Sequence, residues 1–392
     1  YDPAAGNYAT TDTFIWTFVS IFALWIGISV VLYVYGQMKM QPVDVFEAQN
    51  GVNGHSLTTS DLENGLEIVR PTQRATYKFF ALAMVCFGLQ VLGGIVGATD
   101  FMPSRSASTL NRLLLPFTVA RSYHTLLQIF WFFMCWVGYT IFFLPRLTKV
   151  PKGQKTLINL LFAMAIVVAL GVIFGIYAGQ RGWITDDQAA YWFGSQGWEF
   201  IELGRFFQWV LLAAFSLWIF IIYRGVKPWL SKKNVWSVPA WLLWGSGVMV
   251  LFLFFSVLML PSQNFAISDY WRWMTVHMWV EVTFEVFTTV IVAYLLVQMG
   301  LVTRLMAERV VFLAVMLFFV TAINGISHNF YWIAKPTGII AVGSVFSTLQ
   351  VLPLLLLTLD AWAMRQEGGR AQEFRVQGKQ VHVMEGVWLF IL

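Results

Sequence analysis

Nine apolar runs, each between 18 and 27 residues long, constrain what this chain can fold into. A run of about 20 apolar residues has the length that an α-helix needs to cross the hydrocarbon core of a membrane. Backbone polar groups find no water in that layer and must bond within their own segment, so the runs are predicted to be helices. The predicted spans are 13–36, 77–98, 123–144, 157–178, 206–223, 238–260, 273–299, 310–332 and 338–361.

The composition agrees with a membrane protein. Hydrophobic residues make up 58% of the chain and charged residues 11%, whereas soluble domains carry about 25% charged residues. These values exclude a soluble enzyme and a disordered chain. The two cysteines, Cys86 and Cys135, lie in apolar runs and exclude a disulfide scaffold or a Cys-rich metal site. The predicted fold class is all-α, a polytopic transmembrane helix bundle.

The basic residues predict how the bundle is oriented. Alternate loops, at 37–78, 145–156, 224–237, 302–309 and 362–385, hold 18 of the 25 Lys and Arg residues. By the positive-inside rule these loops are cytoplasmic and Tyr1 lies outside. Because the net charge of +5 lies in short loops, no nucleic-acid partner is predicted.

The chain is expected to be a fragment of a longer protein. Residues 1–12 are predicted to be an outer segment that ends a longer N-terminal region, and 13–392 the transmembrane bundle. The apolar run from 386 predicts a truncated tenth span. The connections between spans are expected at breakers, namely Pro116, Pro145, Pro151, Pro261 and Pro336.

Ionisable residues inside spans are the strongest functional signal, because such groups are rare in membranes and usually functional. His277, Glu281 and Glu285 are spaced i, i+4 and i+8, so they share one face of a predicted helix. An imidazole and a carboxylate at i, i+4 can reach one metal ion. This span is therefore predicted to hold a metal site or a proton path.

Two other spans offer histidines. His328 is the obvious further ligand, and its neighbour Asn329 is a poorer one because it offers only an amide. His124 opens an aromatic-rich span, and Arg121 precedes it by one turn. Imidazole suits an axial position on haem iron and Arg suits a propionate, although an interfacial histidine beside an orienting arginine would look the same.

A pair of carboxylates occurs at a predicted outer membrane edge. Glu199 and Glu202 are i, i+3 neighbours and Arg205 follows them. The carboxylates could bind a hard cation such as calcium. The spacing alone favours an ion pair with Arg205.

Four motifs carry a resemblance to a known family. Residues 118–124 (TVARSYH), 197–202 (GWEFIE), 269–281 (DYWRWMTVHMWVE) and 346–350 (FSTLQ) resemble the catalytic subunit of nitric oxide reductases. The similarity is to the single-chain, quinol-dependent branch of the haem–copper oxidase superfamily. It implies a helix bundle in a bacterial cytoplasmic membrane, with a low-spin haem b, a high-spin haem b and a non-haem iron as cofactors. Calcium is a further candidate.

The resemblance also implies roles for individual residues. His124 would be an axial ligand of the low-spin haem b. The implied ligands of the non-haem iron, which faces the high-spin haem, are His277, Glu281 and His328. Glu285 would be a supporting carboxylate behind these ligands. Glu199, with Glu202 beside it, would be linked to calcium near the haem propionates.

The departures from the reductase pattern set the functional prediction. Asn329 stands where the reductases carry a second consecutive histidine, and Gln350 stands where they carry a glutamate. After the pair Gly93–Gly94, Ala98 and Met102 stand where the quinol site has a histidine and a glutamate. The same three losses occur in the nitric oxide dismutases. The predicted reaction is therefore conversion of 2 NO to N2 and O2, with reduction of 2 NO to N2O as the alternative.

Two other classes fit the residues less well. Oxygen-reducing oxidases of this superfamily commonly carry a tyrosine four residues after the first metal-binding histidine, and Glu281 occupies that position here. A non-enzymatic haem sensor or assembly subunit would have no need to retain His277, Glu281, Glu285 and His328. The predicted partners are nitric oxide and the lipid bilayer, and a homo-oligomer is left open.

Overall fold

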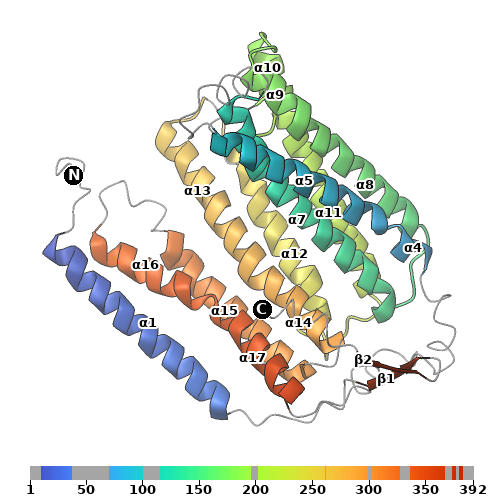
Figure 1. Cartoon of the computed structure of the whole chain (residues 1–392), viewed down its shortest axis with the longest axis vertical. Coiled ribbons are helices and arrows are strands. Elements are labelled where there is room, and N and C mark those ends of the chain that lie inside the picture. Colours follow the sequence, from blue (N-terminus) through green and yellow to red (C-terminus); the bar gives the residue numbers. More distant parts are fainter. Residues whose placement is uncertain are drawn as a thin grey trace. The chain divides into compact units, whose positions relative to one another are not determined.

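The computed structural model describes residues 10–37, 70–99, 115–195, 202–260, 262–298, 302–326, 336–366, 373–376 and 379–382. These residues fall into two compact units. Unit 1 comprises Tyr1–Gly65, Leu230–Phe252 and Trp273–Leu392, and unit 2 comprises Leu66–Trp229 and Leu253–Arg272. Figure 1 shows both units and labels their helices.

The described residues form eight helices that are long and apolar enough to cross a membrane. They coincide with eight of the nine predicted spans. The described part of the remaining one, 310–332, lies in helix α15 (Arg304–Gly325), whose first turns carry Arg304, Glu308 and Arg309. The predicted truncated tenth span lies outside the described residues. The all-α membrane bundle is confirmed.

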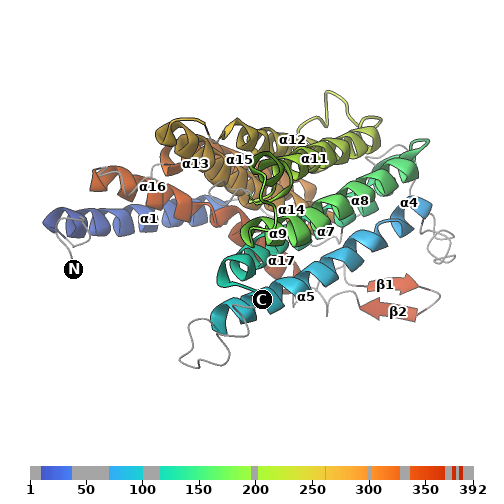
Figure 2. The same ribbon diagram turned by 90° about the horizontal axis from the view of Figure 1, so that it is seen from above.

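Unit 2 is built from antiparallel helices. Its elements are α4 (Pro71–Arg74), α5 (Tyr77–Thr99), α7 (Phe117–Leu147), α8 (Gln154–Leu170), the π-helix η2 (Gly171–Gly175), α9 (Ile176–Gln180), α10 (Asp187–Phe193), α11 (Arg205–Val226) and the 3-10 helix η3 (Phe255–Leu258). Helices α5 and α7 have the most extensive contact and run side by side in Figures 1 and 2. Gly138 of α7 lies against the ring of Phe80 of α5, where a Cβ would come within 2.9 Å of the ring.

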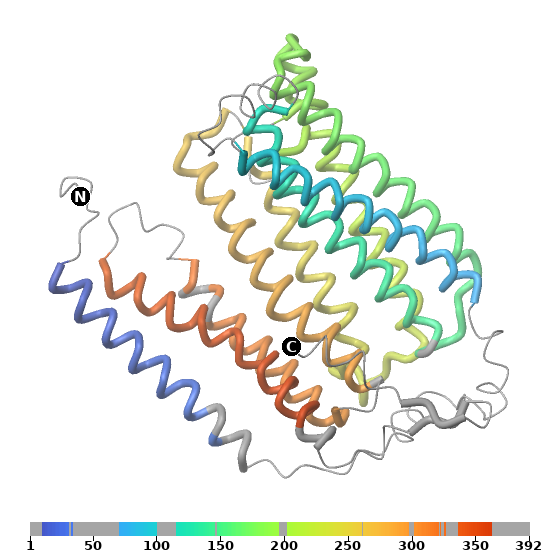
Figure 3. Tube along the Cα trace, viewed as in Figure 1, coloured from blue at the N-terminus to red at the C-terminus, as the bar shows by residue number. Residues whose placement is uncertain are grey.

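Unit 1 holds α1 (Thr11–Gln37), α12 (Val238–Phe254), α15, α16 (Thr337–Leu349) and α17 (Leu352–Gln366). Helix α13 (Phe265–Glu281), whose residues up to Arg272 belong to unit 2, continues into the π-helix η4 (Val282–Phe287) and α14 (Thr288–Gln298), and Figure 3 shows this continuous helix. Helix α1 packs on α16. The strands β1 (Glu373–Val376) and β2 (Lys379–His382) pair antiparallel, with Glu373 opposite His382.

Two details differ from the sequence-based prediction. Pro145 was expected in a connection but lies inside the last turn of α7, where it removes a backbone donor. The hairpin of β1 and β2 lies in a stretch that was expected to be a loop. It was missed because a hairpin of two four-residue strands offers no long alternating pattern.

Candidate functional site

His277 and Glu281 lie one turn apart on α13, and both are buried. His277 Nε2 is 2.9 Å from Glu281 Oε1, and their side chains are 3% and 8% exposed. A charged or strongly polar pair inside a membrane helix costs free energy, and such pairs are usually functional. The contact brings an imidazole nitrogen and a carboxylate oxygen within 2.9 Å of each other, as expected for side chains spaced i, i+4 on one helix face.

Glu285 follows on the π-helix η4. The wider turn of a π-helix changes the direction of the side chains that follow it, and such turns are frequent at functional sites. Glu285 Oε2 is a buried oxygen without a hydrogen-bond partner among the described residues. The site therefore contains two carboxyl groups on successive turns, and Glu281 is in contact with the histidine.

The ends of two further helices of unit 1 lie at His277. A Cβ on Gly325, the last residue of α15, would lie 3.0 Å from His277 Nε2 and 3.2 Å from Ser347 Oγ of α16. Only a glycine permits so close an approach without a shift. His328 follows Gly325 by three residues in the sequence, but His328 and Asn329 lie outside the described residues.

Gln350 lies where two helices meet. It follows α16 as its C-cap, and α17 begins two residues later with Pro353 in its first turn. The predicted span 338–361 matches one candidate membrane span, Thr337–Trp362, but its helix is interrupted by a turn at Gln350 and Val351. Proline cannot donate to the preceding turn, which explains the break.

His124 of α7 lies against α5 in unit 2. Its Nδ1 is 2.9 Å from the carbonyl oxygen of Gln90 and 2.9 Å from the side-chain nitrogen of the same residue. The carbonyl can only accept from Nδ1, whereas the side-chain nitrogen can only donate to it, so the two contacts belong to different tautomers; with the proton on Nδ1, Nε2 keeps its lone pair. A metal-bound histidine is usually held by such a bond from its other nitrogen.

Two glycines let α5 approach α7 closely around His124. A Cβ on Gly94 would lie 2.6 Å from His124 Nδ1, and one on Gly93 would lie 3.3 Å from the carbonyl oxygen of Ala120. From the sequence, this glycine pair was used only to locate the quinol-site positions, and the contact with His124 was not predicted. Of the two positions expected there, Ala98 lies exposed near the end of α5, and Met102 lies outside the described residues.

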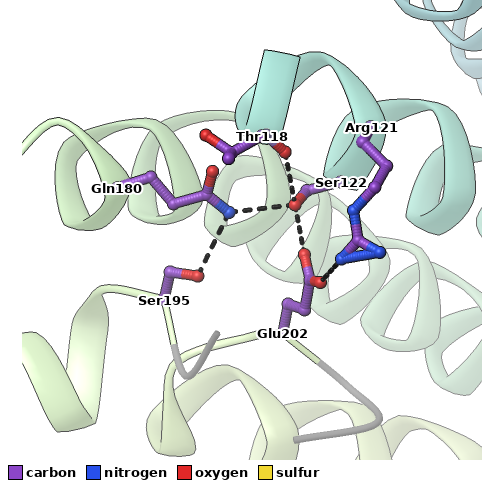
Figure 4. Close-up of polar contacts among 6 residues, drawn as sticks. All are labelled: Thr118, Arg121, Ser122, Gln180, Ser195 and Glu202. Atoms are coloured by element: carbon purple, nitrogen blue, oxygen red, sulfur yellow. Dashed lines mark hydrogen bonds and ion pairs between the residues drawn. The ribbon is translucent and has the colours of Figure 1, made fainter. Parts of the chain in front are cut away.

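Glu202 forms the centre of a second polar cluster in unit 2, shown in Figure 4. Arg121 donates to Glu202 Oε1 and Ser122 donates to Glu202 Oε2. Gln180 Nε2 lies 2.9 Å from Ser122 Oγ and 3.5 Å from Ser195 Oγ. The side chain of Glu202 is 11% exposed and that of Arg121 is 57% exposed.

This cluster differs from the ion pair that the spacing favoured. Glu202 pairs with Arg121 from another helix, while Arg205 donates to Tyr191, Gln208 and the carbonyl of Met259. Local spacing could not reveal a partner 81 residues away. Glu199 lies outside the described residues.

Among the described residues, no group of three or more His, Cys, Asp and Glu side chains is placed to hold a metal ion. The predicted iron site has two of its members, His277 and Glu281, in contact within that part of the chain.

Comparison with known proteins identifies the fold. The family model of the cytochrome c and quinol oxidase polypeptide I matches residues 74–388. The chain belongs to this family. Its membership accounts for the bundle of membrane helices and makes the protein an oxidoreductase.

A similar protein carries a more specific name. It is a subunit of the nitric oxide reductase of Stutzerimonas stutzeri, and it is 27% identical over 332 residues, which are 82% of this chain and 67% of that protein. The resemblance to nitric oxide reductases is confirmed within the oxidase polypeptide I family.

Proposed function

We propose that this member of the oxidase polypeptide I family is a nitric oxide dismutase, which converts 2 NO to N2 and O2 in the membrane. One observation carries the proposal. The buried pair of His277 and Glu281 is kept, while the neutral amides Asn329 and Gln350 stand where the similar reductases carry a histidine and a glutamate.

The described residues fit a non-haem iron. His277 Nε2 and Glu281 Oε1 lie 2.9 Å apart, and an imidazole nitrogen with a carboxylate oxygen is a donor set that iron accepts. Gly325 brings the end of α15 to His277, three residues before His328. We therefore place His328 among the ligands, and Asn329 as a neighbour that donates more weakly.

The residues around His124 fit an axial ligand of a haem. The Gln90 carbonyl holds Nδ1, which leaves Nε2 with a lone pair for iron. Gly94 gives the ring its space. Arg121 would serve a haem propionate only if it shared its guanidinium with Glu202, and a calcium ion on Glu202 would have to displace Arg121 or Ser122.

The metal centres, when bound, supply the sites that bind two NO molecules and exchange electrons with them. The chain's own residues do the rest. His277 Nε2 and Glu281 Oε1 would present their lone pairs to the iron from a buried position, which keeps bulk water away from the reacting atoms. Glu285 adds a carboxyl group one turn further. The amide of Gln350 has no acidic proton to transfer to a reacting atom, whereas a glutamic acid would have one.

The balance of each reaction agrees with these residues. Reduction of 2 NO to N2O and water consumes two electrons and two protons, so a reductase needs an electron donor site and a proton-carrying carboxylate. Dismutation of 2 NO to N2 and O2 consumes neither. Loss of a carboxylate at Gln350, and of a quinol site at Ala98 and Met102, is therefore tolerable for a dismutase and harmful to a reductase.

Reduction of NO to N2O is the second candidate. It is favoured by the relative from Stutzerimonas stutzeri, whose name states that activity. The two candidates differ in whether an electron donor is needed and in which gases form.

The resemblance to nitric oxide reductases implies the membrane, and the basic loops predict the orientation in it. We place the protein in a bacterial cytoplasmic membrane, with residue 1 outside and the basic loops in the cytoplasm.

The experiment gives purified full-length protein, with its haems and iron, nitric oxide labelled with 15N and 18O. Without an electron donor we expect labelled N2 and O2 in equal amounts. A His277→Ala variant serves as the inactive control. Formation of N2O alone, and only when a donor is added, would contradict the proposal. Added quinol should leave the rate of O2 formation unchanged, because Ala98 offers no donor and Met102 no carboxylate to bind a hydroquinone.

A further inference from the structure

One end of unit 2 carries basic residues without acidic ones. Helix α4, the end of α7, the start of α8 and the end of α11 meet there around a cavity of about 10 Å³, which is lined among others by Thr72, Pro145, Gln154 and Gly225. Within the described stretches 70–82, 143–160 and 218–229 there is no Asp or Glu. Basic residues of these stretches include Arg74, Lys78, Lys149, Lys152, Lys155 and Arg224.

Two of these lysines belong to neighbouring membrane helices. Lys78 of α5 donates from Nζ to Asn159 Oδ1 of α8, at 2.5 Å, and lies 4.8 Å from the ring centre of Phe162. Both partners are neutral. Lys155 is exposed and lies one turn before Asn159, so these two side chains share one face of α8.

Because Lys78 contacts Asn159 and Lys155 lies one turn before Asn159, the two ammonium groups share one part of the surface and repel each other, and the low dielectric of the membrane edge strengthens the repulsion. Each ammonium has three donor hydrogens, and Lys78 uses one of them on Asn159. The described stretches around the pair supply no carboxylate to offset the two charges. An anion between the lysines would relieve the repulsion and accept the remaining hydrogens.

The surface beside the lysines is apolar. Met84 of α5 is 68% exposed and Leu160 of α8 is 50% exposed, and both helices are candidate membrane spans. A ligand that matches both the two positive charges and the apolar surface has a phosphate head group and hydrocarbon chains. The basic loops also place this end on the cytoplasmic side, where anionic lipids gather.

The positive-inside rule explains why basic residues lie in these loops. It accounts for Lys78 as a basic residue at the end of a loop, but not for the contact by which Lys78, the second residue of α5, reaches across to Asn159 of α8. We propose that Lys78, Lys155 and Asn159 bind the phosphate of an anionic phospholipid, whose acyl chains lie along the exposed surfaces of α5 and α8.

The test uses the full-length protein in detergent, with phosphatidylglycerol as the probe. Native mass spectrometry measures how many lipid molecules stay bound and with what affinity. Each lysine contributes about 1 kcal/mol, so we expect binding to weaken about fivefold in Lys155→Gln and about 25-fold in the variant with Lys78→Gln and Lys155→Gln.

The matched control replaces Lys232 and Lys233 by Gln. This pair is exposed in the connection before α12, and its replacement removes the same charge as the double variant. Phosphatidylcholine and inorganic phosphate serve as control ligands. We expect the control variant to bind phosphatidylglycerol like the parent protein, and both control ligands to bind weakly.

Three results would overturn the proposal. One is equal loss of binding in the Lys232 and Lys233 control, which would indicate only a general charge effect. Another is that phosphatidylcholine binds as tightly as phosphatidylglycerol. The third is that inorganic phosphate binds as tightly as phosphatidylglycerol without displacing it, which would mean that the phosphate and the lipid occupy different sites. Lys155 is exposed, so the single Lys155→Gln variant keeps the test valid even if the double variant fails to fold.

Discussion

At the scale of single residues, Gly94 decides whether His124 can hold its position. A Cβ at Gly94 would lie 2.6 Å from His124 Nδ1, so Gly94→Ala must displace the ring from the Gln90 carbonyl. We expect a loss of about 1–3 kcal/mol of stability and a weaker low-spin haem absorption band in the full-length protein. Thermal unfolding and the visible spectrum measure the two effects.

The same helix provides the control for that change. A Cβ on Gly88 meets nothing within 4 Å, so Gly88→Ala should leave both the spectrum and the melting temperature near those of the parent. If Gly94→Ala behaves like Gly88→Ala, the close approach of α5 to His124 has no role in holding the haem ligand.

The contact between His277 and Glu281 leads to a second residue-scale prediction. If both bind one iron, either His277→Ala or Glu281→Ala should lower the non-haem iron content well below one per protein, and the double variant should lose little more. Phe284→Leu, at a position 46% exposed, is the control and should keep its iron. Additive losses, or full iron in either single variant, would mean that the two side chains do not share a metal.

At the scale of elements, Gln154 connects the start of α8 to the end of α11. The side chain is buried and donates from Nε2 to the carbonyl oxygen of Ile221, at 2.9 Å. Gln154→Leu leaves that carbonyl without this donor, so we expect a loss of about 1–3 kcal/mol. Thermal unfolding in detergent measures it, with the exposed Lys152→Gln as a control that should change stability little. An unchanged melting temperature in Gln154→Leu would show that α8 and α11 are held by apolar packing alone.

Elements also show what a sequence can predict. The spans were predictable because a long apolar run determines a membrane helix without reference to the rest of the chain. The spacing of His277 and Glu281 was readable for the same reason, since it is local to one helix. The break at Gln350, the π-turn that carries Glu285 and the contact of Gly94 with His124 were not predicted. Each depends on packing between helices, and the pairing of Glu202 with Arg121 joins residues 81 positions apart.

At the scale of the whole molecule, Asn329 and Gln350 are the residues that we propose direct the chemistry toward dismutation. Asn329→His adds an imidazole, which is a better iron ligand than an amide. Gln350→Glu adds an ionisable group where protons are otherwise hard to pass. Because both residues would serve one site, the effects of the two changes should not be additive.

The most direct measurement compares the gases that the full-length parent protein and the variant carrying both Asn329→His and Gln350→Glu form from doubly labelled nitric oxide, with and without an electron donor. We predict labelled O2 and N2 from the parent without a donor. The double variant should lose O2 formation and, given a donor, form some N2O. Formation of O2 by the double variant as fast as by the parent would contradict the role of these two residues, and N2O from the parent itself would contradict dismutation.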